Sequence, residues 1–128
     1  MIDDSLPSKA FYKNMAGLTR AQISLITQLC TAHIPLNKHL YRIKKVPSPL
    51  CPACAGAEES IHHYLFDCQA HEHARITLRR KLGHRSKSLK DLLSDQKAMR
   101  ATLTYVANTR RLHSLFGDVT PLPIQDKP

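Results

Sequence analysis

The residues of this chain that are best suited to chemistry are three cysteines and one histidine in a short central stretch. They are Cys51, Cys54, His63 and Cys68, separated by two, eight and four residues in turn. Three thiolates and one imidazole are a usual tetrahedral set for Zn²⁺, and four protein ligands leave no position for water. The spacing therefore predicts a closed structural zinc site.

The neighbouring histidine, His62, competes for the fourth position. His63 is preferred because that choice leaves three apolar neighbours, Ile61, Leu65 and Phe66, free to turn toward the core. His63 and the last cysteine are five residues apart. Both face one ion only if a helix begins or frays between them.

Disulfide bonds are the main alternative for these cysteines. They would have to pair Cys30, which lies well upstream in an apolar segment, with one member of the cluster. No export signal follows Met1, because Ile2-Asp3-Asp4 is acidic where a positive segment is needed. Disulfides belong to oxidising compartments, so reduced thiols and a location in the nucleus or cytoplasm are expected.

Enzymatic activity is not expected. Ribonuclease H or nickase chemistry needs clustered carboxylates that hold Mg²⁺, and the 10 acidic residues here are scattered. Glu58 and Glu59 lie near the zinc ligands in sequence, but a site with four protein ligands has no open position. Cys30 and His33 are three apart without a third group to orient them.

Helical patterns dominate the segments around the cluster. Thr19 and Gln22 form a capping box that begins a helix, with apolar residues continuing at helical spacing to Leu29. The stretch 69–82 lacks Pro and Gly and ends at Gly83, a common helix stop. Strands are not expected, apart from two short pieces near the metal turn.

Two more helices are expected toward the C-terminus. Ser88 caps a short one, and Asp95 caps a longer one that begins at Gln96. The apolar residues expected along the buried edge of the longer helix, with a kink near Asn108, are Met99, Leu103, Val106, Leu112, Leu115 and Phe116.

The whole chain is predicted to be a mainly α, small helical domain built around one Cys3His zinc site. Its 128 residues suit one domain, and with no Trp and only three Phe its core is thin, so a bound metal would add stability. The predicted parts are an extended N-terminal segment over 1–17, a zinc-stabilised helical domain over 18–117 with its knuckle at 51–68, and a flexible tail over 118–128.

The charge of the chain favours a polyanionic partner. Lys and Arg number 19 against 10 acidic residues, a formal net charge of +9, and nucleic acid is the commonest partner for such an excess. The charge gathers in a basic helix expected within 36–45 and in the acid-free run 75–90. The residues expected to contact DNA or RNA phosphates are Lys38, Arg42, Lys44, Lys45, Arg79, Arg80, Lys81 and Arg85.

Two further expectations concern side-chain placement. Leu36, Leu40 and Ile43 fall at helical spacing on the apolar face of the basic helix. His71 and His73 are expected on the surface, because the metal site already has four donors.

The sequence bears on two other kinds of partner, membranes and proteins. Apolar runs are only a few residues long, so no membrane partner is expected. A partner protein is the alternative, bound by the knuckle and an apolar groove along 103–116 while the charge serves only solubility. The run 75–90 also fits a nuclear localisation signal.

Four stretches of the chain carry a resemblance to a known family: LITQL at 25–29, TAHIPLNKHLYRI at 31–43, SPLCPAC at 48–54 and HHYLFDC at 62–68. They resemble the C-terminal region of fungal non-LTR (LINE-type) retrotransposon polyproteins, which follows the reverse transcriptase and ribonuclease H domains. The likeness runs from about Pro7 to Gly117 and is most specific in the middle.

The resemblance implies an accessory module that helps such a polyprotein hold its RNA or target DNA. The family knuckle, Cys-x2-Cys, seven or eight residues, His, four residues, Cys, falls on the four zinc ligands named above. Three positions depart from the family pattern: Cys30 replaces a basic residue, Ala32 a Gly, and Gln69 a Pro. The polymerase and nuclease domains lie outside this chain, which is therefore expected to be a fragment or a stand-alone derivative.

Overall fold

The computed structural model describes residues 13–121. Within that range the chain forms helices and no strand, which confirms the mainly α prediction, and one isolated antiparallel bridge joins Leu50 to Glu58. The α-helices are α2 (Arg20–Thr31), α3 (Asn37–Arg42), α4 (Glu72–Leu82), α5 (Leu89–Leu92), α6 (Gln96–Thr109) and α7 (His113–Phe116). The other helical segments are the π-helix η1 (His63–Asp67) and the 3₁₀-helices η2 (Gln69–His71) and η3 (Gly83–Lys87).

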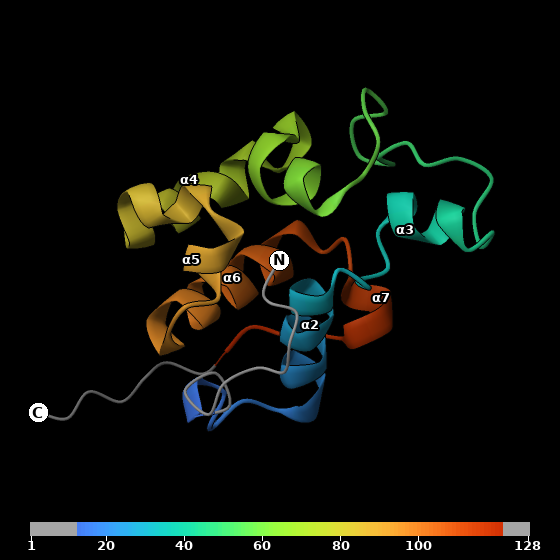
Figure 1. The fold of residues 1–128 in the computed structure, drawn as a ribbon. Helices are drawn as coiled ribbons and strands as arrows, with labels where there is room; N and C mark the ends of the chain where they lie inside the picture. Colours follow the sequence, from blue (N-terminus) through green and yellow to red (C-terminus); the bar gives the residue numbers. More distant parts are fainter. Residues whose placement is uncertain (1–12, 122–128) are drawn as a thin grey trace, which may run out of the picture.

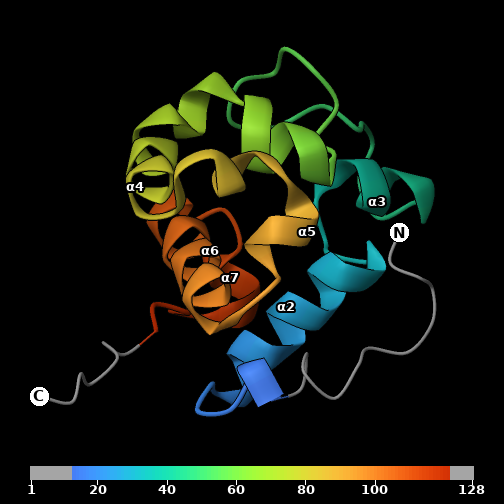
Figure 2. The same ribbon diagram turned by 60° about the vertical axis from the view of Figure 1, so that its left-hand side comes forward.

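α6 is the helix on which much of the fold packs. It lies along α4, the most extensive contact among the described elements, and also contacts α5 and α2 (Figures 1 and 2). Its Met99 and Leu103 are fully buried with Leu78 of α4 and Leu92 of α5, and this removal of apolar surface from water drives the packing. α3 and the loop 43–60 instead form one edge of the molecule in both views.

The side chains predicted to begin helices do so. Thr19 Oγ1 accepts the Gln22 N–H at 3.2 Å, while Gln22 Oε1 accepts the Thr19 N–H at 2.7 Å, which is the predicted capping box. Asp95 accepts the Ala98 N–H at 2.8 Å and begins α6. Each bond pairs a backbone donor that a helix start leaves unsatisfied, so the predicted starts of α2 and α6 are confirmed.

The basic helix is shorter than its sequence pattern suggests. α3 ends at Arg42, and Lys44 takes a left-handed φ of 63°, which no helix continues. Ile43 follows the last turn and is exposed, so its predicted place on the apolar face is wrong. Leu36 is buried as expected.

The C-terminal helices also differ from expectation. Rather than kinking near Asn108, α6 continues to Thr109 and stops where Arg110 takes a φ of 56°. The short helix α7 then leaves Leu115 exposed, although Leu112 is buried. The reversal at Arg110 changes which residues face inward, because α7 does not continue the axis of α6.

Packing continues past the predicted domain boundaries at both ends. Met15 is buried within the segment predicted to be extended. Val119 is buried within the predicted tail, and its carbonyl accepts a hydrogen bond from Gln22 Nε2 at 3.1 Å. The remainder of these predictions lies largely outside the described residues. None of the helices in the described range is long and apolar enough to cross a membrane.

Candidate metal centre

The structure brings the four predicted ligands together. The donor atoms of Cys51, Cys54, His63 and Cys68 all lie within 4.8 Å of one another. Cys51 Sγ is 3.8 Å from Cys68 Sγ, and Cys54 Sγ is 3.4 Å from His63 Nε2. Bonds of about 2.3 Å from Zn to S and about 2.1 Å from Zn to N give a tetrahedron with S···S and S···N edges of about 3.8 and about 3.6 Å. The four side chains can therefore hold one metal ion, and all four cysteines of the chain are free of disulfides.

Backbone hydrogen bonds form the turn that carries the first pair of ligands. The Ala55 N–H donates to the Cys51 carbonyl at 2.8 Å, and Ala55 takes a left-handed φ of 55°. The Gly56 N–H donates to Cys54 Sγ at 3.4 Å. The turn thereby holds two sulfur atoms within reach of one ion.

A change of helix type positions the second pair. In an α-helix, residues five apart point about 140° away from each other. In η1 the Cys68 N–H instead donates to the carbonyl of His63, five residues back, at 2.8 Å, which is the bond of a π-helix. The wider turn lets both side chains face one ion. η1 ends at Asp67 and the backbone of Cys68 is extended, so the helix does end between the two ligands, after one turn of π-helix.

Buried side chains bind carbonyl groups of the ligand segment. Arg75 donates from Nε to the Leu65 carbonyl at 3.1 Å and from Nη2 to the Cys68 carbonyl at 2.8 Å. The Tyr105 hydroxyl donates to the Tyr64 carbonyl. Burial raises the pKa of Tyr105 to about 12, with the Arg75 charge opposing, so the hydroxyl stays protonated at neutral pH. α4 and α6 thus fix the backbone that carries His63 and Cys68.

A buried ion pair fixes the other side of the site. Glu59 is fully buried, and Arg111 donates to its two carboxylate oxygens from Nε and Nη2 at 2.7 Å each. The Asn37 N–H donates to the same carboxylate at 2.7 Å, and Asn37 Nδ2 donates to the Leu50 carbonyl at 2.8 Å. Glu59 therefore joins the start of α3 to the turn after α6, beside the metal turn.

The thiols differ in how readily they ionise. Burial raises the pKa of Cys68 to about 11, whereas the hydrogen bond from the Gly56 backbone lowers the pKa of Cys54. Cysteine binds metals as the thiolate. A bound dication would supply the positive charge that stabilises buried thiolates.

The other histidines of this region stand apart from the cluster. His62 is exposed, so of the neighbouring pair it is His63 that joins the cysteines. His71, predicted on the surface, is buried edge-on to the Tyr64 ring with centroids 5.3 Å apart. The 3₁₀-helix η2 changes the helical phase before α4 and turns His71 inward. His73 is exposed, as predicted.

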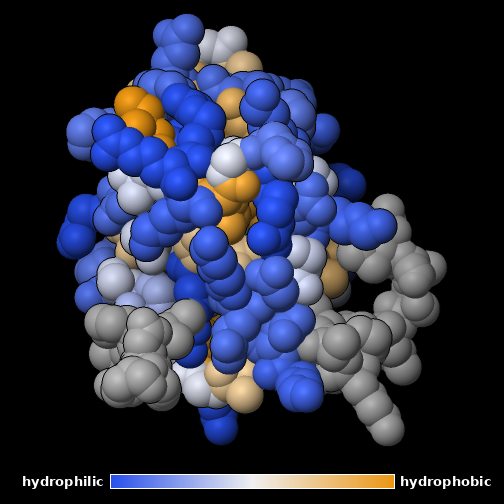
Figure 3. Space-filling model, turned by 90° about the vertical axis from the view of Figure 1, so that its left-hand side faces the viewer, coloured by the Kyte–Doolittle hydropathy of each residue, from blue (hydrophilic) through white to orange (hydrophobic). Residues whose placement is uncertain are grey.

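The eight residues predicted to contact phosphates form two surfaces. The α3 surface consists of Lys38, Arg42, Lys44 and Lys45, all exposed. The α4 surface consists of Arg79, Arg80, Lys81 and Arg85, on α4 and η3. Hydrophilic side chains cover most of the side of the molecule that carries α4 at the left of Figure 1 (Figure 3).

Carboxylates neutralise the two surfaces to different extents. Arg79 Nη2 is 2.6 Å from Glu72, and Arg85 Nη2 is 2.8 Å from Asp95. Hydrogen bonds from Arg79 and Arg75 lower the pKa of Glu72, so this carboxylate is charged at neutral pH. In the α3 surface the described residues supply only one ion pair, that between Lys38 and a glutamate at 3.9 Å.

Sequence reasoning missed the residues that hold the ligand segments. In the sequence Arg75 is distinguished only as part of the basic run, and Glu59 only as an acid near the metal ligands. The one available signal was Glu72 three residues before Arg75, the spacing of a helical ion pair, which forms at 2.7 Å. Nothing in the spacing of Glu59 and Arg111 marks them as partners.

Comparison of the chain with known protein families, with curated proteins and with solved structures finds no match. What the metal centre can do follows from its own geometry. Four protein donors around one ion make a closed site, which suits a structural role.

Proposed function

We propose that the chain is a zinc-dependent, nucleic-acid-binding accessory module without enzymatic activity, derived from a non-LTR retrotransposon polyprotein. The cluster of Cys51, Cys54, His63 and Cys68 is the observation that carries the proposal. Hydrogen bonds join its first half to α3 through Asn37 and its second half to α4 through Arg75. A metal bound there would hold the two basic surfaces in one fixed arrangement.

Zinc is the metal that this donor set favours. Thiolate and imidazole ligands in a four-coordinate tetrahedral arrangement are typical of structural Zn²⁺, and the S···S and S···N distances agree with its bond lengths. Because the site has no free position, the ion would stabilise the fold and take part in no reaction.

The charge distribution supports DNA or RNA as the partner. Lys and Arg outnumber acidic residues by 19 to 10, and eight of them form the α3 and α4 surfaces. Phosphate contacts supply affinity that falls steeply with salt and depends little on sequence. The resemblance of the central stretches to retrotransposon polyproteins supports the same function.

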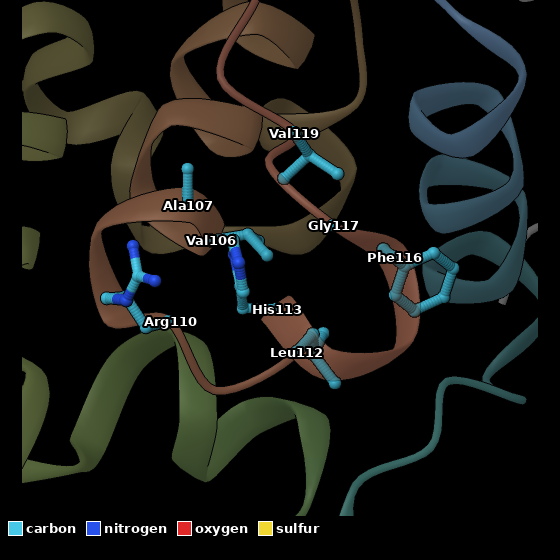
Figure 4. A pocket seen from close by; sticks show the side chains of 8 residues that line it. All are labelled: Val106, Ala107, Arg110, Leu112, His113, Phe116, Gly117 and Val119. Carbon is cyan, nitrogen blue, oxygen red and sulfur yellow. The ribbon is translucent and has the colours of Figure 1, made fainter.

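The structure offers little room for the alternative, a protein-binding groove along 103–116. Leu103, Val106 and Leu112 are buried in the core. The pocket between α6, α7 and Val119 is too narrow to admit a water molecule (Figure 4). Exposed apolar surface on this side is left mainly to Leu115.

Native mass spectrometry tests the metal. The full chain is expected to carry one zinc ion, and Cys54→Ser to lose it, whereas the control Cys30→Ser, outside the cluster, keeps it. Metal-free protein with an unchanged helical circular dichroism signal and melting curve would contradict the proposal.

Fluorescence anisotropy with mixed-sequence DNA and RNA oligonucleotides tests the partner. Affinity is expected to fall by on the order of 10³ between 50 and 200 mM salt if about six phosphates are contacted. Reversing the charge of Arg42, Lys45, Arg80 and Lys81 together should abolish binding, whereas Arg20→Glu, at the opposite end of α2 from α3, should not. Binding that is unaffected by salt would contradict nucleic-acid recognition through phosphates.

A further inference from the structure

Exposed apolar side chains gather in the segment that links α3 to the metal turn. Tyr41, Ile43 and Leu50 are 49%, 46% and 45% exposed. Elsewhere in the described residues, the large exposed apolar side chains are Ile76 on α4 and Leu115 on α7, which stand apart in sequence. Single exposed apolar residues are ordinary on a protein surface, but three within ten residues require an explanation.

Contacts of the backbone and side chains bring this segment together. The Leu50 carbonyl accepts a hydrogen bond from Asn37 Nδ2, at the start of α3. Leu50 also bridges Glu58, whose carboxylate is 3.9 Å from Lys38 Nζ. Lys38 and Tyr41 are three apart in α3 and so share a face of that helix. The apolar residues thus lie beside the cations of the α3 surface.

The charge around Tyr41 is almost uncompensated. Arg42, Lys44 and Lys45 are exposed, and no carboxylate in the described range lies within ion-pair distance of them. Such a combination of exposed aromatic ring, aliphatic side chains and cations is complementary to an anion that also has flat apolar faces. An unpaired nucleotide is such a group, since its phosphate is negative and its base has a π-face.

We propose that the α3 surface binds a single-stranded segment of nucleic acid, with Tyr41 stacking on an unpaired base and Ile43 and Leu50 contacting its neighbours. The proposal rests on the nucleic-acid binding proposed above and specifies its substrate. In a duplex each base is stacked between two others, so its faces are closed to Tyr41. A duplex would therefore use only the phosphate contacts, whereas a single strand uses both.

The backbone of α3, which carries Tyr41, is held by hydrogen bonds at both of its ends. Asn37 begins α3 and is bound by Glu59, which is itself fixed by Arg111. At the other end of the helix, the Lys45 N–H donates to the Leu40 carbonyl at 2.8 Å. A ring carried on a fixed helix has only its own side-chain rotation to lose when a base stacks on it.

The test compares Tyr41→Ala with Tyr41→Phe in the full zinc-loaded chain. The probes are a fluorescein-labelled single strand of mixed sequence, as DNA and as RNA, and the DNA duplex of the same sequence. Tyr41→Ala is expected to lower single-strand affinity on the order of tenfold and duplex affinity by less than about twofold. Tyr41→Phe keeps the ring and should bind like the wild type. Leu115→Ala, which removes a 61% exposed apolar side chain from α7, is the matched control.

A stacking contact also has a spectroscopic signature. A single strand that contains 2-aminopurine should lose fluorescence on binding the wild type and Tyr41→Phe, and lose less on binding Tyr41→Ala at saturation. Unchanged zinc content and circular dichroism of Tyr41→Ala would show that the half-exposed ring does not support the fold.

The outcomes separate this inference from the function on which it rests. Salt-sensitive binding that is equal for wild type and Tyr41→Ala overturns the stacking platform and leaves nucleic-acid binding intact. The stacking platform is also overturned if Tyr41→Ala lowers the affinity for single strand and duplex by the same factor. Failure of the wild type to bind any oligonucleotide overturns both proposals. Binding to anionic phosphatidylserine vesicles that depends on Tyr41, without preference for single strands, assigns the surface to a lipid headgroup layer and overturns the inference.

Discussion

The α3 and α4 surfaces have similar charge but are supported in different ways. α4 buries Ala74, Leu78 and Leu82 against the core, so apolar packing on α6 positions its cations. α3 has no buried residue of its own. Its apolar anchor is the buried cap residue Leu36, which precedes the helix, and polar contacts to Glu59 hold the helix itself.

The two surfaces also differ in how much of their charge is available to a ligand. Glu72 and Asp95 already bind two of the four cations of the α4 surface. The α3 surface keeps nearly all its charge and adds exposed apolar side chains. The region with the weaker apolar support is thus the one with more unpaired charge and exposed apolar surface, and we expect a metal bound at the cluster to stabilise it.

Removal of the metal is the change from which we expect the largest loss of stability. It should destabilise the α3 surface much more than the α4 surface. Chelation, or Cys68→Ala, should lower the free energy of unfolding by on the order of 5 kcal/mol, since metal binding and folding are coupled. Hydrogen exchange is expected to show that the amides of 37–68 lose their protection first, and that the amides of α6 remain protected longest. Loss of protection that is uniform across α3, α4 and α6 would show that the two surfaces do not differ in their support.

Glu59 gives the next largest effect, confined to the side of the molecule that carries α3. Glu59→Gln leaves the Arg111 guanidinium, whose side chain is only 18% exposed, without its counter-charge, which should cost about 3 kcal/mol in denaturant unfolding. Its sequence neighbour provides the control, because Glu58 is exposed and Glu58→Gln should change stability by less than about 0.5 kcal/mol. If the two substitutions lower stability equally, Glu59 does not support α3.

The difference between the surfaces also marks the limit of what the sequence predicts. Local rules suffice where a few neighbouring residues decide the outcome. The capping side chains of Thr19 and Asp95 begin helices as expected, and the spacing of the four metal ligands identifies a cluster that the fold assembles. These patterns depend on short-range geometry, so no knowledge of the tertiary fold is needed.

Long-range pairing is where the same reasoning fails. A charged residue is normally exposed, so the burial of Arg75 and Glu59 is unexpected until Tyr105 and Arg111 are seen beside them. The i→i+5 bond of η1 has no sequence signature either. The π-helix η1 and the 3₁₀-helix η2 change the helical phase before α4, and His71 lies inward, which a constant period of 3.6 residues could not predict.

Neutralising paired and unpaired cations sharpens the comparison of charge. Arg42→Gln with Lys45→Gln should lower single-strand affinity roughly tenfold at 100 mM salt and reduce the salt slope by about one to two, since each lost phosphate contact removes about 0.7. Arg79→Gln with Arg85→Gln should do less, because carboxylates already offset those charges. Lys13→Gln with Arg20→Gln, which removes two exposed charges elsewhere, controls for net charge. A larger effect from the paired arginines would mean that α4, rather than α3, carries the binding surface.

The smallest effect should come from Ala32, which lies where α2 ends before the chain turns into α3. Its φ of 64° is left-handed, a conformation that costs residues with a Cβ about 1 kcal/mol and glycine almost nothing. Ala32→Gly is therefore expected to raise the free energy of unfolding by about 0.5–1 kcal/mol, measured by urea denaturation, while Thr31→Gly, at the last residue of α2, lowers it. Because neither surface changes, the affinity for single strands should stay the same. If the affinity rises together with the stability, then flexibility of the backbone that carries α3, and not only its side chains, limits the affinity of the α3 surface.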